Sequence, residues 1–307
     1  MPKSADPVVL QGGNPHWAVP TRMSHPWAIC EPAISREAGL KTRLFINEEL
    51  HPGEILSLGR GTAAVYSART PDHSHDTNED GAAIISLDAE TAVLAVADGV
   101  GGARGGEQAS GLAIKSLCRA IESTVGEERE LRDGILDGFE KANHTVIDMA
   151  IGAASTLAAV EIEGNHVRPY HVGDSTIIVV GQRGKIKTKT IAHSPVGYGV
   201  EGGFLDENAA MNHKDRDVIS NMIGSTEMHI QVGPILKLAR RDTVLLASDG
   251  LSDNLHTEEI VDLIRKGPLE SSVKALSEKA TSRMLNPNGE NPSKADDLTF
   301  VLFRLNS

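Results

Sequence analysis

The sequence is poor in aromatic residues, in cysteine and in positive charge. Aromatic residues make up 3% of the 307 positions, so the core has to be built mainly from Ala, Val, Ile and Leu. The two cysteines, Cys30 and Cys118, are too few for a disulfide framework, which favours a reducing cytoplasm. With 30 basic and 42 acidic residues, the net charge of −12 argues against a nucleic-acid or anionic-membrane surface.

Long apolar stretches are missing as well. No run approaches the roughly 20 apolar residues that a membrane-spanning helix requires. The first residues show neither the apolar segment nor the cleavage pattern of a signal peptide. We therefore expect a soluble, unprocessed, cytoplasmic monomer that has no nucleic-acid or membrane partner.

The first 55 residues differ from the remainder of the chain. They contain scattered proline and glycine, show weak hydrophobic periodicity and include both tryptophans, Trp17 and Trp27. We expect residues 1–55 to form an N-terminal extension that packs on one domain, residues 56–307.

From Gly61 onward, strand and helix patterns follow one another in an order that favours antiparallel sheets. Short runs of small and β-branched residues predict strands, and apolar residues at helical spacing predict helices. The expected strands are 62–67, 82–87, 91–97, 155–162, 167–172, 176–180, 185–190, 228–238, 243–247 and 298–305, and the expected helices are 109–121, 131–149, 213–221, 257–265 and 269–285. Because strands largely follow strands, we predict an α+β fold, a four-layer α-β-β-α sandwich with two central antiparallel sheets flanked by helices.

Five single carboxylates lie where a predicted strand meets a loop, and four of the five have a glycine neighbour. They are Asp80, Asp98, Asp174, Asp249 and Asp296. Mg²⁺ and Mn²⁺ take oxygen ligands in near-octahedral geometry, and carboxylates from separate strand ends can converge on such ions. A neighbouring glycine leaves room for a backbone carbonyl or a bridging water.

Such a site can hydrolyse a phosphoester without a protein nucleophile. A water held between two cations loses its proton more easily, and the same cations neutralise the phosphate oxygens. A single Asp-Gly after a strand is most often only a turn. The prediction of a metal site therefore rests on the whole set of carboxylates.

The ordered motifs resemble the type-2C family of metal-dependent Ser/Thr protein phosphatases, in its bacterial-like branch. They are TNED at 77–80, AVADGVGG at 95–102, GAAST at 152–156, HVGDS at 171–175, LLASDGLSD at 245–253 and DDLTF at 296–300. The resemblance covers about residues 58–306, and the family's fold agrees with the order of elements above.

The resemblance implies a set of site residues and a reaction. Two central Mn²⁺ or Mg²⁺ ions would be held by the catalytic carboxylates Asp80, Asp98, Asp249 and Asp296 and by the Gly99 carbonyl. Asp174 would help to hold a possible third ion, Glu79 would bind through water, and Thr156 and Ser175 would be structural. The substrate would be phosphoserine or phosphothreonine in a protein, attacked by metal-activated water with no covalent phosphoenzyme.

The sequence departs from the family pattern at the expected phosphate contact. His75 stands where the family usually has an arginine, and a histidine lacks the bidentate, permanently charged fork of arginine. Either Arg69 or Arg104 compensates, or phosphate affinity is weak, and His75 could equally be a plain loop residue. Val100 stands where animal members carry a histidine general acid, which favours the bacterial branch.

Further alternatives concern other chemistries and the segment 193–217. This segment, rich in glycine and polar residues, resembles the family's variable flap and is either a substrate-selecting lid or a plain surface loop.

Cys30 and Arg36 have the C-x5-R spacing of cysteine-dependent phosphatases, but Pro32 lacks the N–H that a phosphate cradle needs. AVADGVGGARGG imitates a dinucleotide-binding loop, but Arg104 replaces its third glycine. A regulatory pseudophosphatase, which binds a partner without turnover, is the non-enzyme alternative.

Overall fold

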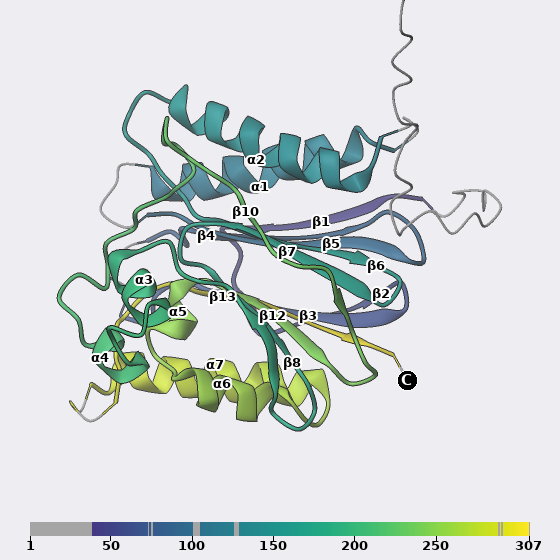
Figure 1. Ribbon diagram of the computed structural model, residues 1–307. Coiled ribbons are helices and arrows are strands. Elements are labelled where there is room, and N and C mark those ends of the chain that lie inside the picture. Colours follow the sequence, from purple (N-terminus) through teal and green to yellow (C-terminus); the bar gives the residue numbers. More distant parts are fainter. Residues whose placement is uncertain are drawn as a thin grey trace, which may run out of the picture. The chain divides into compact units, whose positions relative to one another are not determined.

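The computed structural model describes residues 39–72, 74, 76–100, 105–125, 129–287, 289 and 291–306. They belong to one compact unit, Glu37–Ser307, in which two antiparallel sheets lie face to face (Figure 1). Among the helices of this described part, none has the length and apolar character needed to span a bilayer.

The two sheets contain all the strands of the described residues. The first sheet has the order β1-β4-β5-β6-β7-β10, with β11 also paired to β7, and consists of β1 (Lys41–Ile46), β4 (Asp80–Ser86), β5 (Thr91–Asp98), β6 (Leu157–Glu163), β7 (His166–Val172), β10 (Gln231–Val232) and β11 (Leu236–Lys237). The second has the order β2-β3-β13-β12-β8-β9 and consists of β2 (Leu50–Leu58), β3 (Gly61–Ala68), β13 (Leu298–Leu305), β12 (Thr243–Ala247), β8 (Thr176–Val180) and β9 (Ile186–Lys189).

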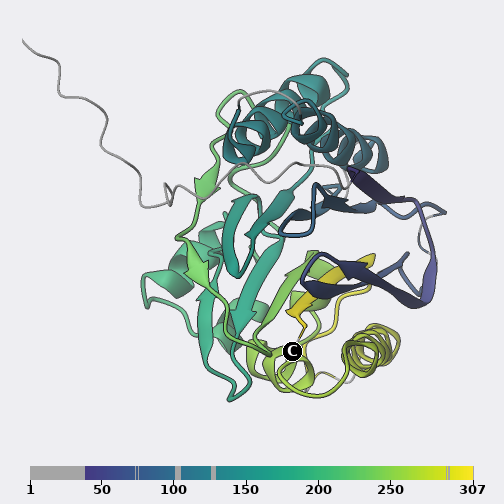
Figure 2. The ribbon, with the colours of Figure 1, turned by 90° about the vertical axis from the view of Figure 1, so that its right-hand side faces the viewer.

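Helices cover the outer face of each sheet. Figures 1 and 2 show α1 (Gly106–Glu122) and α2 (Leu131–Ile147) against the first sheet, and α6 (Thr257–Ile264) and α7 (Leu269–Leu285) against the second. The predicted four-layer α-β-β-α sandwich is therefore confirmed. The remaining helices are short: α3 (Pro195–Glu201), α4 (Glu207–Met211) and α5 (Asp249–Ser252).

Both faces of β5, β8 and β12 are buried, so these strands are apolar apart from their end residues. In β5, Val93, Ala95 and Ala97 pack under α1 and α2, whereas the alternate residues Leu94 and Val96 pack between the sheets. A third apolar layer joins the second sheet to α6 and α7. The ends of these strands, where polar residues begin, are held in place by packing on both sides.

The predicted start of the domain at residue 56 is wrong, because the sheets already include the two preceding strands. β1 pairs with β4 over six residue pairs, from Lys41 with Ser86 to Ile46 with Gly81, and β2 pairs with β3. β1 lies at a sheet edge and is mostly half exposed, and Pro52-Gly53 interrupts β2 at a register shift, so neither shows a clear strand pattern. Trp17 and Trp27 lie outside the described residues, and the packing of the segment before residue 39 stays a prediction.

The prediction is also wrong between residues 190 and 240. The expected helix at 213–221 does not form, and two earlier helices, α3 and α4, occupy this region instead. Each of these helices has a capped N-terminus, since Ser194 accepts a hydrogen bond from the Gly197 N–H and Asp206 accepts one from the Ala209 N–H. The expected strand at 228–238 is reduced to β10 and β11.

Candidate active site

The four carboxylates expected at the centre of the site come from both sheets. Asp80 begins β4 and is paired directly with Asp98, the last residue of β5. Asp249 is the first residue of α5, immediately after β12, and Asp296 lies just before β13. The backbone N–H of Asp249 donates to the Asp98 carboxylate at 3.4 Å. The structure thus brings residues that are far apart in the sequence to one end of the sandwich.

Hydroxyl groups hold the Asp80 carboxylate and the Asp98 backbone in position. Ser248 Oγ donates to Asp80 Oδ2 at 2.7 Å and itself accepts from the Thr299 N–H at 3.1 Å. The Asp98 N–H donates to Thr156 Oγ1 at 3.0 Å, and this oxygen is 2.6 Å from Ser175 Oγ. Thr156 and Ser175 are buried and act structurally, as expected, whereas the role of Ser248 was not predicted.

Glycine is required beside two of the aspartates because other backbone segments approach closely. A Cβ at Gly250 would lie 1.8 Å from the carbonyl oxygen of Asp297, and a Cβ at Gly99 would lie 2.4 Å from the carbonyl carbon of Gly106. The sequence suggested that these glycines leave space for a carbonyl or a water, but the structure gives a different reason for them. The glycines let the strand ends pack against their neighbours.

Asp174 lies in the tight connection between β7 and β8, next to Gly173. Its Oδ1 atom is buried and has no hydrogen-bond partner. Burial, followed by repulsion from Asp249 and Asp253, raises the pKa of Asp174 to about 8. A buried carboxylate oxygen without a donor is costly unless a cation satisfies it.

Asp80, Asp98 and Asp296 also resist ionisation. Burial, together with the charge of Asp297, raises the pKa of Asp80 well above its usual range, and burial and Asp80 do the same for Asp98. Burial and repulsion from Asp249 raise the pKa of Asp296 to about 7. The cause is a concentration of like charges in a desolvated place, which a bound cation would relieve.

Lys294 and Asp253 belong to the same cluster and were not predicted from the sequence. The Lys294 Nζ lies 2.7 Å from Asp249 Oδ2 and 3.1 Å from both Asp253 Oδ2 and Asp296 Oδ2. Burial lowers the pKa of Lys294, but these three carboxylates raise it well above its usual value. Burial and Asp249 raise the pKa of Asp253 to about 6.

The chemical type of the donor atoms fits a hard divalent cation. It consists of carboxylate oxygens, which suit Mg²⁺ and Mn²⁺, and the orphaned oxygen of Asp174 lacks any other partner. Among the described residues, no three His, Cys, Asp or Glu side chains already stand together as a metal-binding group. The ammonium of Lys294 lies among the oxygens that would have to approach such an ion.

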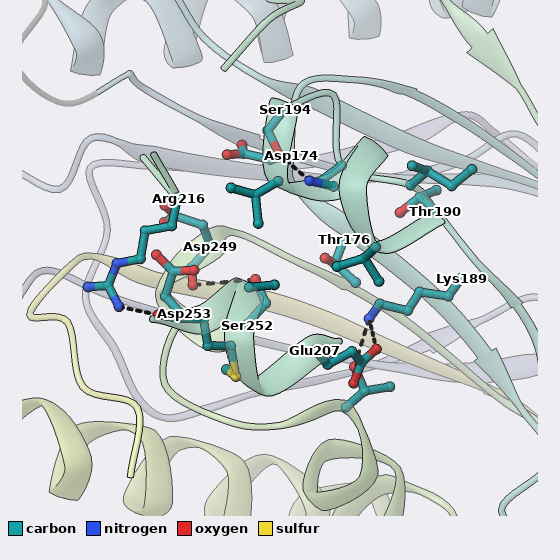
Figure 3. Close-up of a pocket in the computed structure, with 18 of the residues that line it drawn as sticks. Asp174, Thr176, Lys189, Thr190, Ser194, Glu207, Arg216, Asp249, Ser252 and Asp253 are labelled. Carbon is teal, nitrogen blue, oxygen red and sulfur yellow. Dashed lines mark hydrogen bonds and ion pairs between the residues drawn. The ribbon is translucent and has the colours of Figure 1, made fainter. Parts of the chain in front are cut away.

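The segment 193–217 lies beside this cluster, as expected for a flap. It lines one pocket with Asp174 and Asp249, to which it contributes Ser194, Glu207 and Arg216 (Figure 3). At the start of the flap, His193 accepts at Nδ1 from the Gly173 N–H at 3.1 Å, which joins the flap to the connection that carries Asp174.

The predicted phosphate contacts are described only in part. His75 and Arg104 lie outside the described residues, as do Cys30 and Arg36. Arg69 Nη1 donates to the Asp76 carbonyl at 3.2 Å, and its Nε lies 3.6 Å from Glu49 Oε1. The role of His75 stays a prediction.

A family model described as protein phosphatase 2C matches residues 71–288, which is most of the chain. The chain belongs to the protein phosphatase 2C family. The predicted family and the predicted protein phosphatase are thereby confirmed. The match contains Asp80, Asp98, Asp174 and Asp249 and ends before Asp296.

Bacterial phosphatases are among the curated relatives of this phosphatase. It is 26% identical over 238 residues to the Serine/threonine phosphatase stp of Listeria welshimeri, covering 75% of this chain and 90% of that protein. It is 27% identical over 223 residues to the Protein phosphatase PhpP of Streptococcus pneumoniae, covering 70% of this chain and 86% of that one.

Solved structures agree with the fold of this phosphatase. Serine/threonine phosphatase PstP/Ppp of Mycobacterium tuberculosis superposes with a TM-score of 0.65 at 26% identity, covering 80% of this chain and 98% of that chain. Stp1 of Staphylococcus aureus gives 0.69 at 25% identity, with 85% and 98% covered. The catalytic domain of PstP in complex with two manganese ions gives 0.60 at 25% identity, with 79% and 96% covered.

Proposed function

We propose that this protein phosphatase hydrolyses phosphoserine and phosphothreonine in proteins with a water activated by two divalent cations, Mn²⁺ or Mg²⁺, and without a covalent phosphoenzyme. The observation that supports this function is the convergence of aspartates from both sheets into one desolvated cluster. The manganese-containing catalytic domain of PstP, a similar structure, supports the choice of metal.

In this proposal, the central ions are held by Asp80, Asp98, Asp249, Asp296 and the Gly99 carbonyl, and Asp174 binds a third ion. When bound, the cations would lower the pKa of a coordinated water and neutralise phosphate oxygens. The protein's own contribution is orientation. Ser248 and Thr156 fix the strand ends that carry Asp80 and Asp98, and Asp297 accepts the N–H groups of Thr70 and Glu79.

The phosphoprotein would reach the cluster through the pocket beneath the flap. The lining of this pocket also includes Val196, Val200 and Ile260, so it combines apolar with acidic side chains. His75 is our proposed phosphate contact. The monomeric state and the cytoplasmic location likewise remain predictions.

The test is hydrolysis of a phosphoserine peptide by the purified protein with Mn²⁺, and its loss on adding EDTA. Asp249→Asn should abolish turnover because it removes a charge from the centre of the cluster. Asp262→Asn is the matched control, since Asp262 is an exposed carboxylate on α6 paired with Arg265. Absence of turnover in a folded wild-type protein with Mn²⁺ would favour the pseudophosphatase alternative.

A further inference from the structure

Lys294 occupies a cation position inside the acidic cluster. Its Nζ lies within 3.3 Å of four carboxylates, those of Asp217, Asp249, Asp253 and Asp296. One ammonium cannot balance four carboxylates, although Arg216 also contributes, with its Nε 3.8 Å from Asp217 Oδ1. The lysine therefore holds the cluster together without neutralising it.

The backbone of Lys294 is held in place by two hydrogen bonds to the side chain of Asn254. Its N–H donates to Asn254 Oδ1 at 2.9 Å, and its carbonyl accepts from Asn254 Nδ2 at 2.8 Å. Asn254 is fully buried and also donates to the Gly250 carbonyl at 2.9 Å. The residue that positions Lys294 thus also holds α5, the helix that begins with Asp249. The ammonium site is part of the fold.

The same oxygens serve two purposes. Asp249 and Asp296 contact the ammonium and are also two of the proposed ligands of the central ions. An ammonium and a divalent cation repel each other at such distances. The ammonium contacts the Oδ2 atoms of Asp249 and Asp296, so an ion that binds between these carboxylates competes with it for the same oxygens.

We propose that Lys294 is an internal competitor for divalent cations at Asp249, Asp253 and Asp296. This inference rests on the proposed metal-dependent function. The ammonium stabilises the metal-free cluster. The divalent cation must therefore be more concentrated to occupy the site than it would have to be if the lysine were absent. Metal loading then exchanges one cation, attached to the chain, for another from solution.

Calorimetric titration of Mn²⁺ into the metal-free protein tests the competition without using activity. Lys294→Met keeps the length of the side chain and removes its charge, so Mn²⁺ should bind about tenfold more tightly or better. Lys274→Met is the control, because Lys274 is exposed on α7 and pairs with Glu278, and its affinity should equal that of the wild type. Lys294→Arg keeps the charge and should not show the gain.

Thermal unfolding separates competition from a purely structural ion pair. In EDTA, Lys294→Met should melt below the wild type because its carboxylates lose their counter-ion. Saturating Mn²⁺ should raise the melting temperature of the variant by more than that of the wild type. A structural role alone would lower both melting temperatures equally. If Lys294→Met does not fold, Lys294→Gln is expected to show the same two differences.

The outcomes separate this inference from the function on which it rests. Equal Mn²⁺ affinity in the wild type and in Lys294→Met would overturn the competition and leave the metal site intact. Failure of Mn²⁺ to bind to either protein would overturn both. Binding to both proteins, about tenfold tighter in Lys294→Met than in the wild type, is the result that the competition predicts.

Discussion

The hydroxyl of Ser248, at the end of β12 in the second sheet, donates a hydrogen bond of 2.7 Å to the carboxylate of Asp80 in the first sheet. The two residues are 168 positions apart in the sequence. Both are buried, at 0% and 1% exposure, so this contact links the two sheets inside the candidate active site.

Ser248→Ala should weaken Mn²⁺ binding and lower stability. Removing the hydroxyl leaves the Asp80 carboxylate without this donor, and the expected loss of stability is about 1–3 kcal/mol. Ser277→Ala is the matched control, because Ser277 is another buried serine, whose hydroxyl donates to the Lys274 carbonyl within α7. Chemical unfolding and Mn²⁺ titration should show a stability change in both variants but an affinity change only at Ser248. Unchanged Mn²⁺ affinity in Ser248→Ala would contradict the role given to this contact.

Thr156→Val should cost more stability than Thr124→Val, although both replace a buried hydroxyl by a methyl group. At Thr156 the change leaves the Asp98 N–H without its acceptor, at a cost of about 1–3 kcal/mol. At Thr124 the hydroxyl donates to the Ile121 carbonyl, which also accepts from a backbone N–H. The free energies of unfolding decide the comparison, and equal losses would show that Thr156 does not support Asp98.

Gly250→Ala should disrupt the site, since its Cβ would lie 1.8 Å from the carbonyl oxygen of Asp297. We expect a loss of about 3 kcal/mol or more, because the clash is with backbone and cannot be relieved by a side-chain rotation. Gly39→Ala is the control, because a Cβ there meets nothing within 4 Å. Melting temperatures near that of the wild type for both variants would contradict the packing described here.

Asp174→Asn should stabilise the metal-free protein, by an amount that depends on pH. The pKa of Asp174 is raised from 3.8 to about 8 in the folded state, so the folded protein retains a proton that the unfolded chain has lost. Stability from this group is therefore complete below about pH 4 and is lost as the pH rises toward 8. In EDTA, the variant's advantage in melting temperature should grow over this range and then level off. A constant difference across it would contradict the buried, unpartnered carboxylate, and Asp262→Asn should show no such trend.

The sequence identified those strands whose two faces are buried. The expected ranges 176–180, 243–247 and 298–305 coincide with β8, β12 and β13, because continuous apolar runs end sharply at turn residues. Strands β1 and β2 were missed because an edge position and the Pro52-Gly53 interruption hide the pattern. The helix expected at 213–221 does not form, and the helices of this region begin earlier, where Ser194 and Asp206 cap their N-termini.

The same contrast applies to the candidate site. Its aspartates could be predicted because each lies at the start or the end of an apolar strand, and because the motifs that contain them follow one another in a characteristic order. Ser248 and Lys294 were not, since their roles depend on where a side chain ends in space. Lys294 lies in a polar loop, and nothing in its local sequence indicates that Asn254 directs it toward Asp249.

The central claim, that these aspartates hold divalent cations, is tested most directly by anomalous diffraction at the manganese edge. Crystals of the wild-type protein grown with Mn²⁺ should show two strong peaks among Asp80, Asp98, Asp249 and Asp296. The Lys294 ammonium should be displaced from Asp249 in the same crystals. Crystals of protein that hydrolyses the phosphopeptide, with no manganese peak between these four carboxylates, would contradict the account.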